Sequence, residues 1–135
     1  MYDDTITLYN IVDGKGYRSI IKKVHLETNL GVAVENTGMK ENDNLLCLIP
    51  LTSFEKKYVN WKEFRNMNEE EREKYFTFKN GDKIVAGEID FEITNEKPNT
   101  IADLERKYVD VFTITNFSLK KLTGSKLNHF EVVGK

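Results

Sequence analysis

A chain of 135 residues can bury a hydrophobic core without disulfides or metals, and its length fits one domain. Hydrophobic residues make up 39% and charged residues 31% of the sequence, a globular balance that excludes a disordered chain. The net charge of -2 argues against a nucleic-acid-binding protein, because such proteins neutralise phosphates with clustered lysines and arginines. We therefore expect a single domain over residues 1–135 with no specific nucleic-acid ligand.

The first 28 residues have the pattern of a β-hairpin. Apolar and polar residues alternate over Thr5–Val12, as they do in a half-buried strand. Asp13–Gly16 follows and offers glycines for a slightly long turn. Tyr17–Thr28 alternates again, and we expect it to pair with the first strand.

Two further strands are predicted before residue 53. Gly31–Glu35 has the pattern of a short strand, and Asn44–Thr52 is apolar at nearly every position, which indicates that both of its faces are covered. Pro50 cannot donate to a strand ladder, so this end of the strand is expected at an edge or a bulge. The polar stretch between the two strands, Asn36–Asn44, is expected to project as a loop.

Residues 53–75 interrupt the strands with an irregular helical insertion. Asn60 and Asn68 are candidate N-caps for two short turns, and Glu71 stands at the position that completes a capping box with Asn68. Tyr75–Phe78 returns to β-forming residues.

The second half of the chain predicts four strands and one helix. Thr100–Asp103 has the pattern of a capping box, and the apolar spacing that follows predicts a short amphipathic helix ending near Tyr108. Gly87 indicates a bulge or tight bend between two of the strands. The expected strands cover Lys83–Ala86, Glu88–Thr94, Val109–Phe117 and Leu127–Val133. Together these elements predict a mainly β fold, a small β-barrel or sandwich with one short helix and the helical insertion.

The search for catalytic or metal-binding residues finds no credible constellation. His25 and His129 lie far apart in the sequence without metal-ligand spacing, and Cys47 stands in an apolar run where its reactivity is expected to be poor. We expect no enzyme activity, no metal and no cofactor. The chain also lacks a signal-peptide pattern at its start and any apolar run long enough to span a membrane, which predicts the cytoplasm and no membrane contact.

Two groups of side chains leave alternatives open. Glu88, Asp90 and Glu92 alternate along one predicted strand, as on a solvated sheet face, or they await a basic partner. The aromatic residues around the insertion either anchor it to the β core or pack against a neighbouring subunit.

Three stretches of the sequence are distinctive: Tyr2–Asn10 (YDDTITLYN), Gly81–Gly87 (GDKIVAG) and His129–Lys135 (HFEVVGK). They resemble small proteins from the structural operons of tailed phages and prophages of low-GC Gram-positive bacteria, a group described as minor capsid or head–tail connector proteins. The resemblance covers most of the chain by order and length, and none of the three stretches is a catalytic motif.

The resemblance implies a structural virion-assembly protein, a head–tail connector or stopper-type ring subunit at the portal–tail junction. Its partners would be further copies of itself and the neighbouring portal, adaptor or tail proteins, with DNA passing through the ring lumen. The protein would reside in the host cytoplasm before assembly and in the virion afterwards. Alternatives are a tail terminator or other tail component and, from another class, a small β-barrel module that binds oligonucleotide or peptide. Candidate subunit-contact residues are Thr37, Met39, Lys40, Trp61, Phe64, Tyr75 and Phe76.

Overall fold

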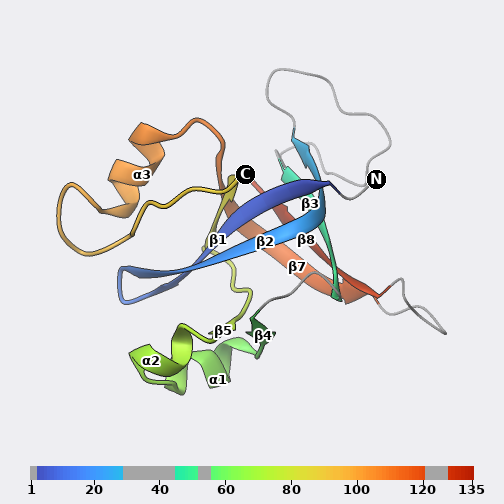
Figure 1. Cartoon of the computed structure of the whole chain (residues 1–135), viewed down its shortest axis with the longest axis horizontal. Helices are drawn as coiled ribbons and strands as arrows, with labels where there is room; N and C mark the ends of the chain where they lie inside the picture. Colours follow the sequence, from blue (N-terminus) through green and yellow to red (C-terminus); the bar gives the residue numbers. More distant parts are fainter. Residues whose placement is uncertain (1–2, 29–44, 52–55, 121–127) are drawn as a thin grey trace.

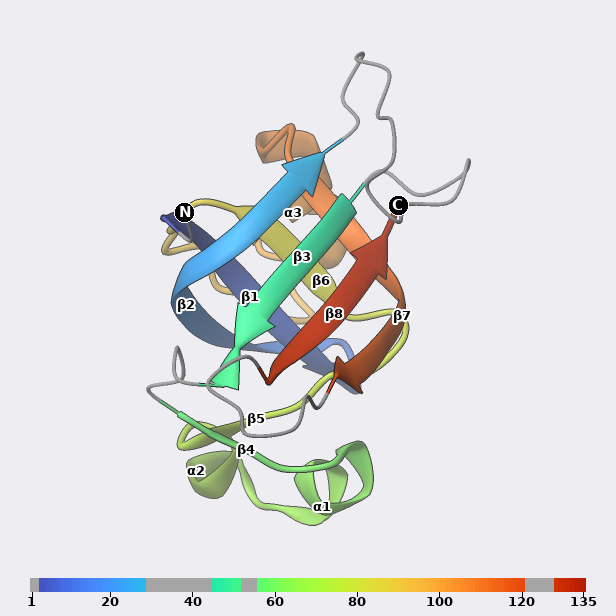
Figure 2. The ribbon, with the colours of Figure 1, turned by 90° about the vertical axis from the view of Figure 1, so that its right-hand side faces the viewer.

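Six strands pair antiparallel around a common core in a computed structural model that describes residues 3–28, 45–51, 56–120 and 128–135 (Figures 1 and 2). Their order around the barrel is β1-β2-β3-β8-β7-β6, and β6 pairs with β1 as well as with β7. The predicted mainly β fold, a small barrel or sandwich, is confirmed. The strands are β1 (Asp4–Val12), β2 (Lys15–Thr28), β3 (Leu45–Pro50), β6 (Lys83–Ala86), β7 (Val111–Lys120) and β8 (His129–Gly134).

The two longest strands, β2 and β7, each change their pairing partner partway along their length. β2 pairs first with β1 and then, from His25 onward, with β3. β7 pairs first with β6 and then, from Ile114 onward, with β8. Each strand has a register irregularity at the change of partner, at Lys23 (φ 60°) in β2 and at Thr115 in β7. A bulge bends a strand and increases its twist, which lets one strand pair with two partners.

The β1–β2 hairpin is confirmed, but its turn is shorter than predicted. Val12 pairs with Lys15, so the turn has only Asp13 and Gly14, with φ of 51° and 82°. Positive φ at both central residues is the two-residue hairpin geometry that matches strand twist. Gly16 lies in β2 instead, where a Cβ would stand 2.8 Å from the Cβ of Ile93.

The barrel interior is filled by apolar side chains from every strand. β3 is covered on both faces as predicted: Leu45, Cys47 and Ile49 are fully buried on one face, and Leu46 is 4% exposed on the other. Pro50 is its last residue, beyond the part of β3 that pairs with β2, which agrees with the expected edge. Of the predicted strand over residues 44–52, the described residues Leu45–Pro50 form β3, whereas Leu51 lies beyond its end. The predicted strand Gly31–Glu35 and the predicted loop Asn36–Asn44 lie outside the described residues.

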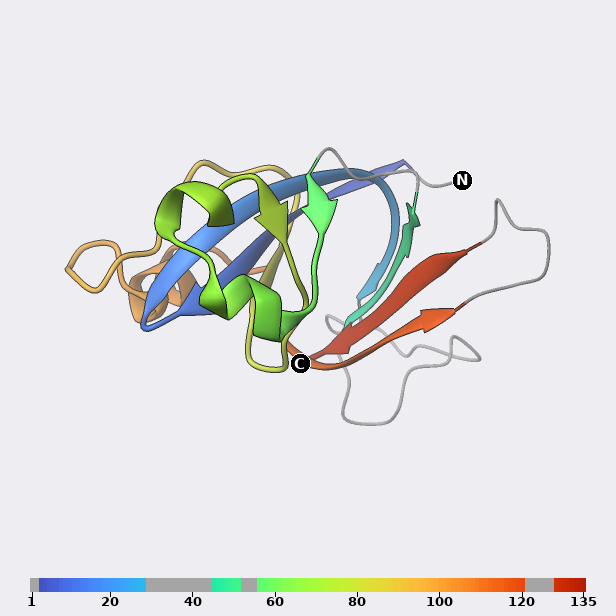
Figure 3. The same ribbon diagram turned by 90° about the horizontal axis from the view of Figure 1, so that it is seen from below.

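The helical insertion folds as a cap over one end of the barrel (Figures 2 and 3). We use "cap" for residues 56–80, which contain β4 (Lys57–Tyr58), α1 (Trp61–Asn66), α2 (Glu69–Arg72) and β5 (Tyr75–Phe76). Both predicted N-caps are confirmed: Asn60 accepts from the amide of Glu63, and Asn68 forms the capping box with Glu71. The parallel pairing of β4 with β5 was not predicted.

A second excursion, residues 87–110, covers the outside of the barrel at β1. It contains α3 (Ile101–Lys107), whose capping box of Thr100 and Asp103 is confirmed. The predicted strand Glu88–Thr94 is wrong, because this stretch belongs to no sheet. Its alternation is real, since Phe91 and Ile93 are buried beside Tyr9 of β1. Side-chain groups of the barrel supply three of its hydrogen bonds, and the backbone amide of Gly16 in β2 supplies one more.

Candidate functional site

The cap is joined to the barrel by a buried amide. Asn10 is the third inward-facing residue of β1 after Ile6 and Leu8, and its side chain is fully buried. Its Nδ2 donates to the carbonyl of Thr77 at 2.7 Å, and its Oδ1 accepts from the amide of Thr77 at 3.2 Å. The Asn10 side chain thus takes the place of a neighbouring strand for the returning cap segment. The sequence signal was a polar residue at an inward strand position, which we had not singled out.

Asp82 completes this buried polar group. Its carboxylate accepts from Asn10 Nδ2 at 2.9 Å and from the backbone amide of Ile11 at 3.0 Å, and it lies 3.4 Å from Lys79 Nζ. These three partners favour the charged carboxylate, yet burial outweighs them and raises the pKa of Asp82 above its ordinary value. The role of this carboxylate is structural, because both of its oxygens contact groups of the cap or of β1.

Arg72 holds the cap's two helices and the hairpin together. Its guanidinium donates to the carbonyls of Phe64 and Arg65 at 3.1 and 2.7 Å, and to the hydroxyl of Tyr17 at 3.1 Å. The rings of Tyr17 and Phe64 meet edge to face at 5.8 Å. A planar fork with several donors suits this role better than a lysine would.

The seven candidate contact residues divide into three groups. Thr37, Met39 and Lys40 lie outside the described residues. Phe64 and Phe76 are 0% and 1% exposed within the chain, so as placed they offer no surface to another subunit. Their burial instead agrees with the alternative that the aromatic residues anchor the insertion. Trp61 and Tyr75 are half-buried and remain candidates for contact.

A basic groove runs between the cap and the hairpin. It is lined by Trp61, Arg65, Arg72 and Lys79 together with Ile11, Val12 and Asp13, and it has a volume of about 480 Å³. The ammonium group of Lys79 lies 5.0 Å from the centre of the Trp61 ring. A flat ring beside several cations is an arrangement that can hold an anionic, partly aromatic ligand.

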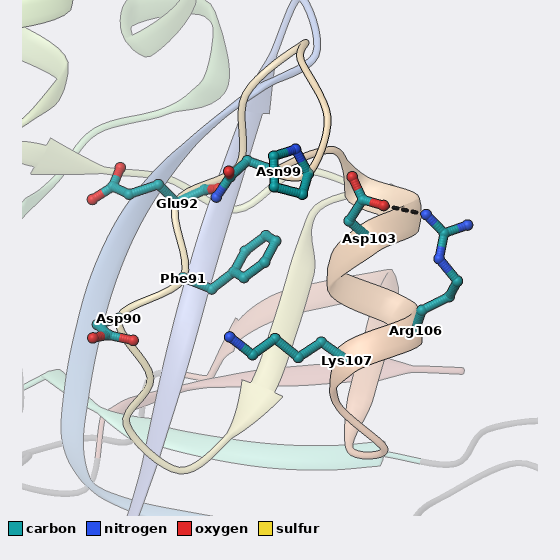
Figure 4. Close-up of a pocket in the computed structure, with 8 residues that line it drawn as sticks. Asp90, Phe91, Glu92, Asn99, Asp103, Arg106 and Lys107 are labelled. Carbon is teal, nitrogen blue, oxygen red and sulfur yellow. Dashed lines mark hydrogen bonds and ion pairs between the residues drawn. The ribbon is translucent and has the colours of Figure 1, made fainter.

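A larger groove of about 590 Å³ lies between the extended segment 88–94 and α3 (Figure 4). Phe91 points from the segment toward α3, and Lys107 points back, with its Nζ 5.7 Å from the Phe91 ring centre. Asp90 and Glu92 point away from the helix (Figure 4). The remaining lining residues are Pro98, Asn99, Asp103 and Arg106.

The carboxylate of Asp103, on the α3 side of this groove, already has partners in its own helix and at the N-cap of that helix. It accepts hydrogen bonds from the amide and hydroxyl of Thr100, and it pairs with Arg106. These interactions hold the pKa of the Asp103 carboxyl below its ordinary value. The carboxylate therefore serves the capping box, not proton transfer.

The residues that could carry catalysis have structural environments. Cys47 is fully buried, and desolvation raises the pKa of its thiol, which lowers the thiolate fraction. His25 Nε2 lies 2.9 Å from Glu27 Oε1 on the same strand. Within the described residues, no three His, Cys, Asp or Glu side chains are grouped to hold a metal. The same residues include no helix with the length and apolar character needed to cross a membrane. That the chain is not an enzyme stays a prediction.

The comparisons with known proteins add one finding. The searches of curated proteins and of solved structures each found no match. A family model does match, and it covers residues 1–135. The chain therefore belongs to DUF6751, a family of unknown function.

Proposed function

We propose that this chain is a structural virion-assembly protein of a tailed phage or prophage, and that copies of it form a head–tail connector or stopper-type ring at the portal–tail junction. The observation that carries the proposal is the resemblance of three stretches to phage neck proteins. These stretches provide strands β1, β6 and β8 of the barrel. The first and second also meet in the buried hydrogen bond between Asn10 and Asp82. The resembling stretches therefore contain residues that form the barrel and join it to the cap, and similar residues are expected at such positions in proteins that share the fold.

The physical properties of the surface are compatible with assembly. A ring of identical subunits needs a contact between two different surfaces of the same chain, and such head-to-tail contacts close when the rotation permits. The chain offers two differently charged grooves, the basic one at the cap and the mixed one beside α3. The partners would be further copies of the chain and the neighbouring portal, adaptor or tail proteins.

A gene deletion tests this proposal. We expect a phage or prophage that lacks the gene to produce DNA-filled heads that leak or do not join finished tails, as seen by electron microscopy. Supplying the wild-type gene in trans restores joined particles and serves as the control. Normal virions from the deletion strain contradict the proposal, and aberrantly long tails favour the tail terminator.

The basic groove favours one alternative of another class, a β-barrel module that binds oligonucleotide. Trp61, Arg65, Arg72 and Lys79 supply a ring and three cations. The test is a mobility-shift titration with single-stranded DNA at physiological salt, repeated with Arg65→Glu. Retardation by wild-type protein at micromolar concentration, lost in the variant, supports the module; no retardation excludes it in practice.

A further inference from the structure

We infer that the backbone edge at residues 90–92 accepts an extended segment of another protein chain as an added strand, within the groove beside α3. The inference does not rest on the proposed function, because the edge is open whichever protein supplies the segment. Three observations carry it: the hydrogen bonds of the segment 88–94, the shape of the groove and the charges along its rim.

The hydrogen bonds show which backbone groups of the segment face the barrel. The amide of Ile89 donates to Thr7 Oγ1 at 3.1 Å, and the carbonyl of Ile89 accepts from Arg18 at 3.4 Å. The carbonyl of Phe91 accepts from the Tyr9 hydroxyl at 2.6 Å. The carbonyl of Ile93 accepts from the Gly16 amide at 3.0 Å. These four hydrogen bonds join the amide and carbonyl of Ile89 and the carbonyls of Phe91 and Ile93 to β1 and β2.

The even-numbered residues present the opposite edge. In an extended chain, the N–H and C=O of one residue point to one side and those of the next residue to the other side. Among the described residues, the amides of Asp90 and Glu92 and the carbonyl of Asp90 have no hydrogen-bond partner. The carbonyl of Glu92 accepts from Asn99, a residue of the groove wall, at 2.9 Å. Through Asn99, this edge faces one wall of the groove beside α3.

A groove between an unpaired strand edge and a helix suits an extended peptide. Unpaired backbone groups at such an edge supply main-chain hydrogen bonds, while side-chain pockets supply specificity. Here the apolar lining residues are Phe91, which is 8% exposed, and Pro98. On this edge the segment lacks a partner strand. Its side chains alternate between buried and exposed, as in a strand, although the segment belongs to no sheet.

The charges along the edge define the chemistry of the occupant. Glu88 and Glu92 each lie near a cation of β2, at 3.9 Å from Lys22 and 3.8 Å from Arg18. Asp90, between them, has no ion pair within the part of the chain that the structure describes. Opposite charges on directly paired residues of neighbouring strands stabilise the pairing. The occupant is therefore an extended segment with a Lys or Arg opposite Asp90 and apolar residues on either side of it, which face Phe91.

The test is a titration of the full-length, ¹⁵N-labelled protein with the blocked peptide Ac-Thr-Val-Lys-Val-Thr-NH₂, followed by NMR at millimolar peptide. We expect the largest amide shifts at Asp90 and Glu92, together with slower hydrogen exchange of both amides. In Asp90→Pro the backbone donor is lost, and we expect about threefold to tenfold weaker binding, as for one hydrogen bond. A second variant, Asp90→Lys, keeps the amide and should prefer the same peptide with Glu in place of Lys.

The matched control is Glu70→Lys, which makes the same change in charge on the exposed surface of α2 in the cap. It should bind the Lys peptide like the wild-type protein. The inference is overturned if the amides of Asp90 and Glu92 do not shift, or if Asp90→Lys and Glu70→Lys respond alike to both peptides. Normal virions from the deletion strain would contradict the proposed function but would not change the expected peptide binding. The two proposals can therefore be contradicted independently.

Discussion

The cap and the α3 excursion are two insertions into one barrel, and they are attached in different ways. The cap sends Phe76 and Phe78 into the barrel interior and is joined there by Asn10 and Asp82. The α3 excursion packs on the outside of the barrel, through a separate cluster around Tyr9, and among the described residues the amides of Asp90 and Glu92 and the carbonyl of Asp90 have no partner. From this difference we infer that the cap mainly stabilises the barrel, whereas the α3 side binds the extended segment proposed above.

The largest expected effect comes from emptying the cap's anchor. Phe78 is fully buried, with its ring 4.9 Å from that of Phe130 and 5.6 Å from that of Phe76. Phe78→Ala should lower the free energy of unfolding by about 3–5 kcal/mol, because it removes apolar burial and leaves a cavity. Urea unfolding measures the change. Glu70→Ala in the same cap should change stability by less than about 0.5 kcal/mol, and a comparable loss in both variants would contradict the anchoring role.

A smaller loss is expected when the buried amide is removed. Asn10→Ala leaves the amide and carbonyl of Thr77 and one oxygen of Asp82 without their partner. Each buried polar group left unsatisfied costs about 1–3 kcal/mol, and shared relaxation brings the expected total to about 2–3 kcal/mol. The control is Asn116→Ala on the exposed face of β7, which should be nearly neutral. Equal stability of the two variants in urea would show that Asn10 does not join the cap to the barrel.

On the α3 side, the loss of a helix cap should cost less. Thr100→Ala removes the hydroxyl that accepts from the amide of Asp103. The expected loss is about 1 kcal/mol, and Thr100→Ser should restore most of it. The comparison of the two variants by thermal unfolding checks this. A loss as large as that of Phe78→Ala would mean that the α3 side is as strongly coupled to the core as the cap is.

The last difference concerns pH dependence. Burial raises the folded-state pKa of Asp82 above 3.8, whereas the unfolded chain keeps the ordinary value. Below the unfolded pKa both states are protonated and this group does not change stability. As pH rises above that value, the unfolded chain ionises while the buried carboxyl stays protonated, so stability falls until pH has passed the folded pKa. The wild-type protein should therefore lose stability relative to Asp82→Asn with rising pH across this range. Urea unfolding at a series of pH values measures the difference, and a constant or opposite trend would refute the effect of burial.

Much of the framework could be predicted from local patterns. The hairpin, the covered strand β3 and the caps at Asn60, Asn68 and Thr100 depend on neighbouring residues, and each is where the pattern indicated. Glu88–Thr94 failed as a strand because alternation reports burial of one face and not the presence of a ladder. Phe64 and Phe76 were candidate contacts because an aromatic residue gives the same signal in a core and in an interface.

The remaining features depend on contacts between distant parts of the chain. Asn10 and Asp82 are 72 positions apart, and each alone reads as an ordinary strand or turn residue. The open edge at Asp90 and Glu92 follows from the hydroxyls of Thr7 and Tyr9, which bind the other edge of the segment. Such pairings are set by the tertiary structure and leave no periodic signal in the sequence.

The proposed assembly role is tested most directly by cryo-electron microscopy of the neck of a tailed phage that encodes this chain. We predict a ring of copies of the barrel between the portal and the tail, with an extended segment of an adjoining chain paired along residues 90–92. A well-defined neck that contains no copy of this barrel would contradict the proposed function.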